Sequence, residues 1–227
     1  MATITRRLVK LKEYLAQLNR LNNTEEYKIN MQIELAYEIQ NRIAHQKLVA
    51  NKVLKKLELL DRYCIVAGGA PRDWYLGNIA KDIDVYLHYP LLIKSQQREN
   101  LLNELGLNVQ SRHDNWKQVT EIYQTNRFIT QLYNSNIRGE KVQIMFVSEP
   151  TFTSVVNTFP ISISKAWYKR EEIGLTPEFE TSVKHKILWK TEDSYLEDNK
   201  YLTKIREKFS DYIYVPKEVG VEFMGRK

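Results

Sequence analysis

The sequence predicts an α+β fold, in which a small mixed β-sheet carries packed helices and is preceded by an N-terminal helical hairpin. Three observations predict this class. Apolar residues recur at three- and four-residue steps through residues 1–60, as they do on one face of a helix. Short apolar or alternating runs between residues 61 and 150 are typical of strands. Residues 151–227 mix helical patterns with basic and aromatic residues, so we treat them as an extension of the core.

The first sixty residues contain no glycine or proline, which favours long helices. One helix face of the first arm is marked by four leucines, Leu8, Leu11, Leu15 and Leu18. Asn22 and Asn23 then interrupt the pattern, and Thr24 followed by two glutamates is a typical helix start. We therefore expect a hairpin whose second arm is long or broken near His45, and which serves packing or dimerisation rather than catalysis.

The predicted core begins with a strand, a tight turn and a short helix. The apolar run Cys64–Ala67 is bounded by Gly68-Gly69, which is typical of a buried strand that ends in a turn. Pro71 suits the first turn of a helix, and Gly77 ends it. Polar and apolar residues then alternate over 82–87, as in a half-exposed strand. Further patterns predict a helix over 91–105, paired strands over 119–123 and 127–133, and a strand over 141–147.

Composition narrows the range of partners and compartments. The net charge of +6 favours anionic partners such as RNA, DNA or nucleotides, although ordinary solubility explains it equally well. A single cysteine, Cys64, excludes an internal disulfide and a cysteine zinc cluster, and its apolar neighbours favour a buried thiol. No apolar run reaches the roughly 20 residues of a membrane span, and the N-terminus lacks an apolar signal core. We expect a protein of the cytoplasm, in a cell or an infected host, with no membrane partner.

Two patterns in the core carry chemistry when they are combined. The Gly68-Gly69 turn lets backbone approach a ligand, and the following helix directs its first amides to the same place, which suits phosphate. Asp82 and Asp84 stand two residues apart on a strand, so both carboxylates project from one face. A cation relieves their repulsion, and Mg²⁺ (or Mn²⁺) shared with a triphosphate is the natural choice. Each pattern alone also occurs as a structural turn or a solvated strand end.

The combined run VAGGAPRDWYLGNIAKDIDVYL, residues 66–87, resembles the polymerase β-type nucleotidyltransferase superfamily. Its form is most similar to the head domains of CCA-adding enzymes and bacterial poly(A) polymerases. The resemblance implies that Gly68 and Gly69 bind the triphosphate of an NTP and that Asp82 and Asp84 bind the catalytic metal.

The same resemblance suggests roles for the two residues that follow the turn. Arg72 would meet a phosphate or a substrate carbonyl, and Asp73 would brace the loop through a salt bridge. Two later runs, SVVNTFPISISKAWYKR and YLTKIREKFSDYIYVP, resemble small phage-encoded nucleotidyltransferases.

The sequence departs from the superfamily pattern at the strand that usually supplies a third carboxylate. The matching position is Gln143, and an amide cannot act as a general base. Three explanations are compatible with this residue. Glu140 or Glu149 reaches the site instead, or metal alone activates the acceptor, or the domain binds nucleotide without transferring it. The Arg-Arg-Asp-Phe-type run of CCA-adding enzymes is also absent.

The predicted function is transfer of NMP, with AMP from ATP first among the candidates, to a hydroxyl acceptor. An RNA or tRNA 3′ end, a protein side chain and a small molecule all fit such a corner. Two clusters of cations and aromatic residues, 165–170 and 184–190, suit either nucleic-acid stacking or a tryptophan-containing core, and the net charge favours the first. The alternatives are a nucleotide- or RNA-binding module with little catalysis, and a toxin- or antitoxin-type enzyme acting on protein or tRNA.

Overall fold

The computed structural model describes most of the chain in two compact units, residues 1–42 and 43–227. The described residues are 13–14, 16–18, 20, 25–88, 94–113, 128–148, 151–191 and 200–225. The predicted hairpin turn at Asn22–Thr24 lies outside them, as does the predicted strand over 119–123. No helix of this described part is long and apolar enough to cross a membrane.

Helix α2 (Glu25–Leu57) begins in the first unit and ends in the second. It continues without a break through His45, so the predicted second arm is long. Several large apolar side chains of its first half are exposed: Ile29, Met31, Ile33, Leu35 and Tyr37. Its last turns contribute to the core of the second unit through Ile43, Val49, Ala50, Val53, Leu54 and Leu57.

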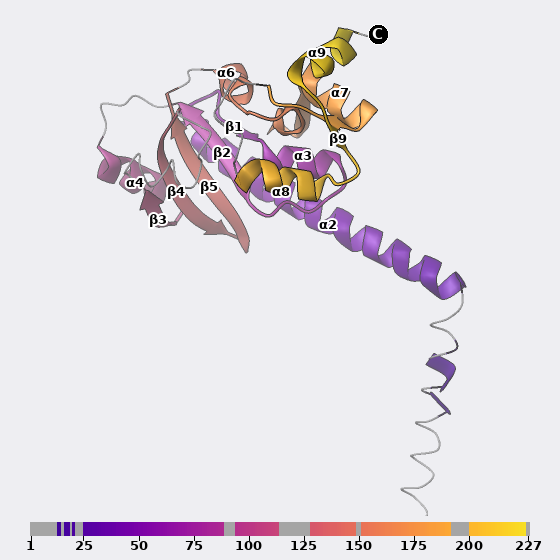
Figure 1. Ribbon diagram of the computed structural model, residues 1–227. Helices are drawn as coiled ribbons and strands as arrows, with labels where there is room; N and C mark the ends of the chain where they lie inside the picture. Colours follow the sequence, from indigo (N-terminus) through magenta and orange to yellow (C-terminus); the bar gives the residue numbers. More distant parts are fainter. Residues whose placement is uncertain are drawn as a thin grey trace, which may run out of the picture. The chain divides into compact units, whose positions relative to one another are not determined.

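A seven-stranded sheet with the order β3-β4-β5-β2-β1-β6-β7 organises the second unit (Figure 1). The strands are β1 Ile65–Ala67, β2 Ile83–His88, β3 Val109–His113, β4 Ile129–Ile137, β5 Glu140–Val147, β6 Ala166–Lys169 and β7 Glu172–Leu175. Only β2 and β5 are parallel neighbours, and the other five pairs are antiparallel. The expected mixed sheet is therefore confirmed.

Short helices and a second small sheet complete this unit. They are α3 Gly69–Tyr75, α4 Ser95–Glu104, α6 Phe152–Asn157, α7 Pro177–His185, α8 Lys200–Lys208 and α9 Lys217–Gly225, with the 3₁₀ turn η1 Ser162–Ser164 and strands β8 Ile187–Leu188 and β9 Ile213–Tyr214. Strands β6 and β7 come from the segment after residue 150, yet they extend the main sheet beyond β1. The domain boundaries at 60 and 150 remain a prediction.

Strand β3 was not expected from the sequence. Its residues, Val-Gln-Ser-Arg-His, include one apolar side chain, so no alternating pattern marks them as a strand. It is an edge strand, and pairing with β4 provides the order that the local sequence does not.

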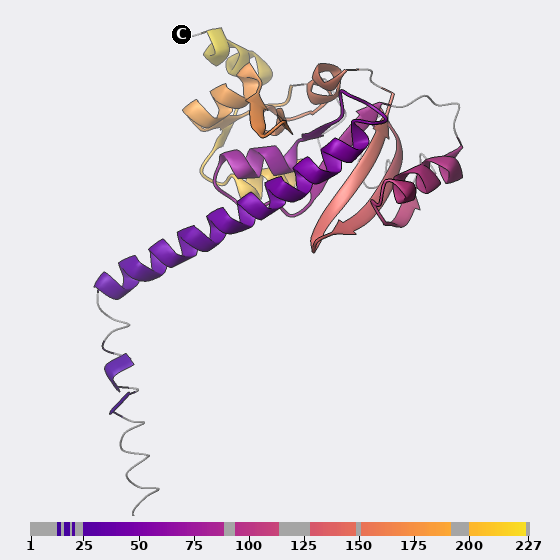
Figure 2. The ribbon, with the colours of Figure 1, turned by 180° about the vertical axis from the view of Figure 1, so that it is seen from behind.

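Side-chain alternation divides the sheet into two faces, and we call the one beneath α2, α3 and α4 the covered face. Figure 2 looks onto it, with the end of α2 in front of the strands. The Cys64 thiol lies 3.7 Å from the Leu54 carbonyl oxygen of α2. On α3, the Trp74 ring meets the ring of Tyr168 on β6 edge-on at 5.2 Å. These helices exclude water from one side of the sheet.

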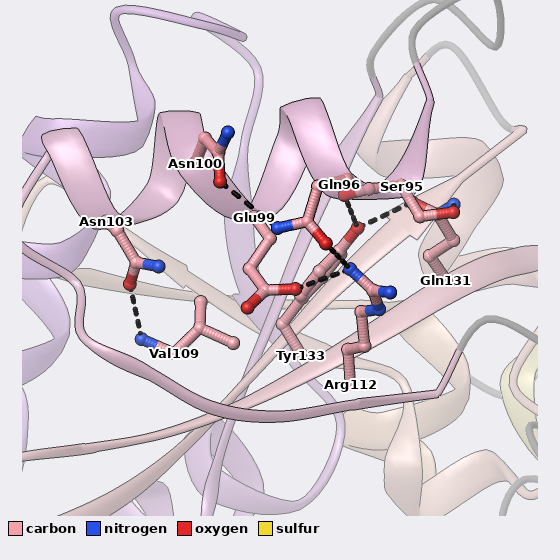
Figure 3. Close-up of polar contacts among 9 residues, drawn as sticks. All are labelled: Ser95, Gln96, Glu99, Asn100, Asn103, Val109, Arg112, Gln131 and Tyr133. Carbon is pink, nitrogen blue, oxygen red and sulfur yellow. Dashed lines mark hydrogen bonds and ion pairs between the residues drawn. The ribbon is translucent and has the colours of Figure 1, made fainter.

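Helix α4 is tied to β3 and β4 by polar side chains (Figure 3). Arg112 Nη1 donates to Gln96 Oε1 at 2.8 Å and to Glu99 Oε2 at 2.6 Å. The Tyr133 hydroxyl of β4 donates to the Ser95 carbonyl oxygen at 3.1 Å. Because Arg112 and Tyr133 are direct cross-strand partners, this network holds the β3–β4 edge in a single register.

The opposite face is divided along its strands. Toward the ends of β2 and β5 it is apolar, and α6 and Phe159 cover it. That cluster contains Ile65, Ala67, Tyr86, Ile129, Leu132, Met145, Val147, Val155, Val156 and Phe159. Toward the starts of β2 and β5 the same face carries half-buried Asp84 and Gln143, and Asn134 from β4. We call this second part the polar end.

The two aromatic clusters of the C-terminal segment mainly form core. Trp189 and Tyr168 are each 1% exposed, and a side-chain carbon on Gly220 would lie 2.4 Å from the Trp189 ring. Lys165 is buried, and its Nζ donates to Glu178 Oε1 at 3.2 Å. Packing against neighbouring segments buries the rings of Tyr168 and Trp189, so the interpretation of these two residues as a stacking surface for nucleic acid is wrong. Trp167 is half-buried, and its contact with nucleic acid stays a prediction.

Candidate metal and triphosphate site

The Gly68-Gly69 turn follows β1 directly. The Gly68 N–H donates to the Ala166 carbonyl oxygen of β6 at 2.9 Å. Gly68 has φ 82°, a left-handed conformation that strains any residue with a Cβ. The position of a Cβ on Gly69 would lie 3.7 Å from Arg72 Nη2. The turn therefore brings the half-buried Gly69 close to the Arg72 guanidinium, whereas Gly68 is buried. A phosphate-binding role for this corner stays a prediction.

Arg72 and Asp73 form a buried ion pair below this turn. Arg72 Nε donates to Asp73 Oδ1 at 2.8 Å, and Lys208 Nζ of α8 donates to Asp73 Oδ2 at 2.7 Å. Asp73 thus braces the loop through salt bridges, as expected. Burial alone lowers the pKa of the Arg72 guanidinium, but Asp73 and the Tyr201 hydroxyl together raise that pKa above its ordinary value. The guanidinium stays cationic although it is only 6% exposed.

Tyr201 is a site residue that the sequence did not indicate. It lies on α8, and its hydroxyl oxygen is 2.7 Å from Ser164 Oγ. Besides acting on Arg72, it contributes to the raised pKa of Tyr86 on β2. A tyrosine near the start of an amphipathic helix carries no motif, so only the packing of α8 shows its place.

Asp82 and Asp84 are presented by β2. Asp82 immediately precedes the strand, Asp84 is its second residue, and both are half-buried. Burial raises the pKa of the Tyr86 phenol well above its ordinary range, and the charges of Asp84 and Asp82 raise it further. Asp84 shares a face of β2 with Tyr86 by alternation, and Asp82 lies near enough for its charge to act on the same phenol.

Gln143 stands beside Asp84 because β5 pairs with β2 in that register. Gln143 Nε2 donates to Asn134 Oδ1 on β4 at 2.9 Å. Asn134 Nδ2 donates in turn to Ser111 Oγ on β3 at 3.0 Å. Side by side across the neighbouring strands β2, β5, β4 and β3 lie Asp84, Gln143, Asn134 and Ser111. We call these four residues the polar row.

Glu140 does not complete the site. It lies an odd number of residues before Gln143, so it belongs to the other face of β5. There it is buried and accepts a hydrogen bond from Gln46 Nε2 at 2.9 Å. The hypothesis that Glu140 reaches the aspartates is therefore wrong, and Glu149 lies outside the described residues.

The donors at the polar end fit a magnesium ion that is shared with a nucleotide. In the described part of the chain, no three His, Cys, Asp or Glu side chains gather closely enough to hold a metal by themselves. Mg²⁺ commonly takes one or two protein carboxylates and completes its octahedron with waters and substrate phosphates. Asp82 and Asp84 supply such a pair, and Gln143 adds an amide beside them.

Comparison with known families decides where the sequence belongs. The sequence model of the Gabija anti-defense 2 family matches residues 38–186, about two thirds of the chain. The chain belongs to the Gabija anti-defense 2 family. The matched part of this family member contains the glycine turn, both aspartates and Gln143, and ends before Tyr201. No curated protein matches the sequence significantly.

Solved CCA-adding enzymes share the fold of this family member. The Thermotoga maritima CCA-adding enzyme complexed with tRNA is 12% identical with a TM-score of 0.54, over 82% of this chain and 44% of that one. A CCA-adding enzyme in complex with ATP is 14% identical with a TM-score of 0.53, over 75% and 39%. A complex with CTP is 12% identical with a TM-score of 0.50, over 82% and 44%. The chain thus spans less than half the length of these structures, and the nucleotidyltransferase-like fold is confirmed.

Proposed function

We propose that this protein transfers a nucleoside monophosphate, AMP in the first instance, from an NTP to a hydroxyl acceptor and releases pyrophosphate. We further propose that the transfer acts against the Gabija defence named in the family's description. One observation carries the proposal: within a nucleotidyltransferase-like fold, the half-buried Asp82 and Asp84 stand at the start of β2, and the described apolar cluster of the Asp84 face lies further along the strands. The Gly68-Gly69 turn with Arg72 provides the phosphate-binding part.

Each residue has a definite task in this proposal. Asp82 and Asp84 hold Mg²⁺ or Mn²⁺, which when bound stabilises charge on the transferred phosphoryl group and lowers the pKa of the acceptor hydroxyl. The half-buried backbone at Gly69 lets the triphosphate approach without a Cβ in the way, and Gly68 provides the turn that precedes it. The Arg72 guanidinium, held by Asp73, adds a fixed positive charge next to Gly69.

An RNA or tRNA 3′ end is the acceptor that we favour. The net charge of +6 attracts a polyanion, and one structure with this fold was solved with tRNA. A protein side chain or a small molecule remains a possible outcome of the test below.

The direct test measures label transfer. The purified chain is incubated with each α-³²P-labelled NTP, Mg²⁺ or Mn²⁺, and either a tRNA pool or host protein extract. We expect label in tRNA with wild type and with Glu172→Gln, a control variant at an exposed carboxylate of β7, and none with Asp84→Asn. No transfer to any acceptor, together with intact NTP binding by Asp82→Ala, would contradict the enzymatic proposal.

Gln143 favours one second candidate, a nucleotide- or RNA-binding module with little or no catalysis. An amide in place of a third carboxylate removes a proton acceptor from the polar end. This candidate predicts NTP binding with no label transfer under any of these conditions.

A further inference from the structure

We propose that the acceptor is a single-stranded nucleic acid, and that its phosphate backbone binds Lys141 and Arg138 at the turn between β4 and β5. The inference rests on the proposed transfer function and adds the surface that recognises the acceptor. It gives a task to two cations that belong to neither the glycine turn nor the pair of aspartates.

The order of the strands gives the two aspartates two different sides. Strand β2 lies between β1 and β5. On the β1 side, the antiparallel pairing of β1 with β2 brings the glycine turn alongside the start of β2. On the β5 side, Asp82 and Lys141 each lie one residue before the first parallel pair of β2 and β5, so they are neighbours. Asp82 therefore lies between the proposed triphosphate corner and Lys141.

Phosphoryl transfer places the acceptor and the leaving group on opposite sides of the α-phosphorus. The acceptor oxygen bonds to that phosphorus while the bond from phosphorus to the bridging oxygen of pyrophosphate breaks, with the two oxygens roughly in line. The proton of the acceptor hydroxyl passes to solvent. In the proposed function the glycine turn and Arg72 hold the triphosphate, so pyrophosphate leaves on the β1 side. The acceptor then approaches from the β5 side, and the chemistry of that side identifies it.

The hairpin of β4 and β5 presents two positive charges at this side. Among residues 129–147 the charged side chains are Arg138, Glu140 and Lys141. Arg138 and Lys141 are exposed, whereas Glu140 is buried and bound to Gln46 on the covered face. In the part of the chain that the structure describes, neither cation has an ion pair or a side-chain hydrogen bond. Both charges are therefore available to an anion.

Hydrogen bonds hold the backbone of this hairpin end in place. His45 Nε2 lies 3.2 Å from the Arg138 carbonyl oxygen, and the Gly139 N–H donates to Asn136 Oδ1 at 3.1 Å. Asn136 is also the cross-strand partner of Lys141. The backbone that carries both cations is thus ordered before an acceptor binds, which lowers the entropic cost of binding.

A polynucleotide fits this surface better than the other acceptors do. By alternation, Lys141 belongs to the same face as Gln143, which is the face of the polar row. A 3′-terminal nucleotide that presents its hydroxyl at Asp82 carries its own 5′ phosphate close by, where the Lys141 ammonium neutralises it. Asn136, exposed beside Lys141, adds an amide that suits base and sugar groups. A small neutral acceptor would leave both cations without an anion.

The test measures binding of single-stranded nucleic acid, which needs no transfer reaction. Fluorescence anisotropy follows the full chain with a short labelled RNA and with DNA of the same sequence, and the tighter probe identifies the sugar of the acceptor. Lys141→Gln combined with Arg138→Asn should weaken binding about tenfold. The slope of log affinity against log salt should fall by about 1.4, because each phosphate contact in a single strand contributes about 0.7. Asn readily adopts the φ of 53° found at Arg138, so the turn is retained.

The matched control is Lys52→Gln combined with Lys55→Gln, which removes two exposed positive charges from α2. Its affinity for the same probe should stay within about twofold of wild type, because phosphate contacts are local. Equal losses in both double variants would show a general effect of net charge and would overturn the proposed surface. An unchanged affinity of the hairpin variant would overturn it as well.

Nucleotide binding separates this proposal from the proposed function. The hairpin variant should bind a non-hydrolysable ATP analogue with Mn²⁺ as tightly as wild type does, because the triphosphate corner lies on the β1 side. No transfer by wild type, with nucleic-acid binding that still depends on the hairpin, would contradict the transfer function alone. Transfer of label to an acidic host protein, with RNA and DNA binding unchanged in the hairpin variant, would overturn the nucleic-acid acceptor alone.

Discussion

Gln46 and Gln143 have the same side chain on opposite faces of one sheet. Gln46, on helix α2 that packs on the covered face, is 1% exposed. Its Nε2 donates to the Ala80 carbonyl oxygen and to Glu140 Oε2, both at 2.9 Å, and its Oε1 accepts from Trp74 Nε1 at 2.9 Å and Ala80 N at 3.0 Å. Gln143 is half-buried at the polar end and donates to another amide beside a carboxylate.

The difference indicates that the covered face stabilises the fold and that the polar end serves binding. All the hydrogen-bonding capacity of Gln46 joins α2 to α3, to the loop before Asp82 and to the start of β5, so this residue stabilises the fold. Gln143 lies beside Asp84 and Asn134, and the described apolar cluster of this face lies further along the strands. Substitutions on the covered face should therefore change stability, and substitutions at the polar end should change binding and transfer.

The largest effect is expected at Asp84. Asp84→Asn should reduce NMP transfer by about 1000-fold or more, because metal stabilisation of the transition state is worth several kcal/mol. Its free energy of unfolding should change by less than about 1 kcal/mol, since relief of the repulsion from Asp82 offsets the weakened contacts of the charged side chain. Label-transfer rates and urea unfolding measure the two quantities. A large decrease in the free energy of unfolding would contradict the assignment of stability to the covered face and of binding to the polar end.

The comparison itself is tested by replacing both glutamines with leucine. Gln46→Leu leaves the buried Trp74 N–H and Glu140 carboxylate without a partner, so it should cost about 3 kcal/mol. Gln143→Leu should cost less than about 1 kcal/mol, because Gln143 and its partner Asn134 are only half-buried, so that water can replace the lost hydrogen bond. Urea unfolding followed by circular dichroism measures both. Equal losses would mean that the two residues are equally structural.

Alanine substitutions at the two glycines of the turn should have different effects, on the free energy of unfolding at Gly68 and on nucleotide binding at Gly69. Gly68→Ala meets only ordinary contacts with Phe159, but its φ of 82° should cost about 1–2 kcal/mol. Gly69→Ala should keep stability and weaken ATP-analogue binding about tenfold, because its methyl group occupies space beside Arg72. Thermal unfolding and analogue titration test the pair, and the reverse pattern would contradict the assignment.

The smallest effect near neutral pH is expected at Cys64, on the covered face. Burial raises the pKa of the Cys64 thiol to about 12, and the nearby Lys169 charge only partly opposes this. The thiol should not react with iodoacetamide at pH 8 until the protein unfolds. As pH rises, the thiol ionises in the unfolded chain before it ionises in the folded protein. The contribution of the buried Cys64 thiol to the free energy of unfolding is therefore complete below pH 9 and is lost as pH rises toward 12. Rapid alkylation of the folded protein would contradict the burial of the Cys64 thiol.

Much of the candidate site follows from short spacings. Gly68-Gly69 and the Asp82/Asp84 pair are local patterns, and alternation predicts that both aspartates lie on one face. Helix α2 was equally predictable, because no glycine or proline interrupts it. These features depend on backbone geometry over a few residues, so they can be predicted from short stretches of the sequence.

The tertiary structure decided what stands next to these residues. It placed Gln143 beside Asp84, directed Glu140 to Gln46, brought Tyr201 to Arg72, and buried the aromatic rings of Tyr168 and Trp189. By itself, the sequence determined which side chains share a face of β2 and where the backbone has to turn. It did not determine which strand or helix lies alongside, because strand register and helix docking minimise the free energy of the whole core rather than of any local segment.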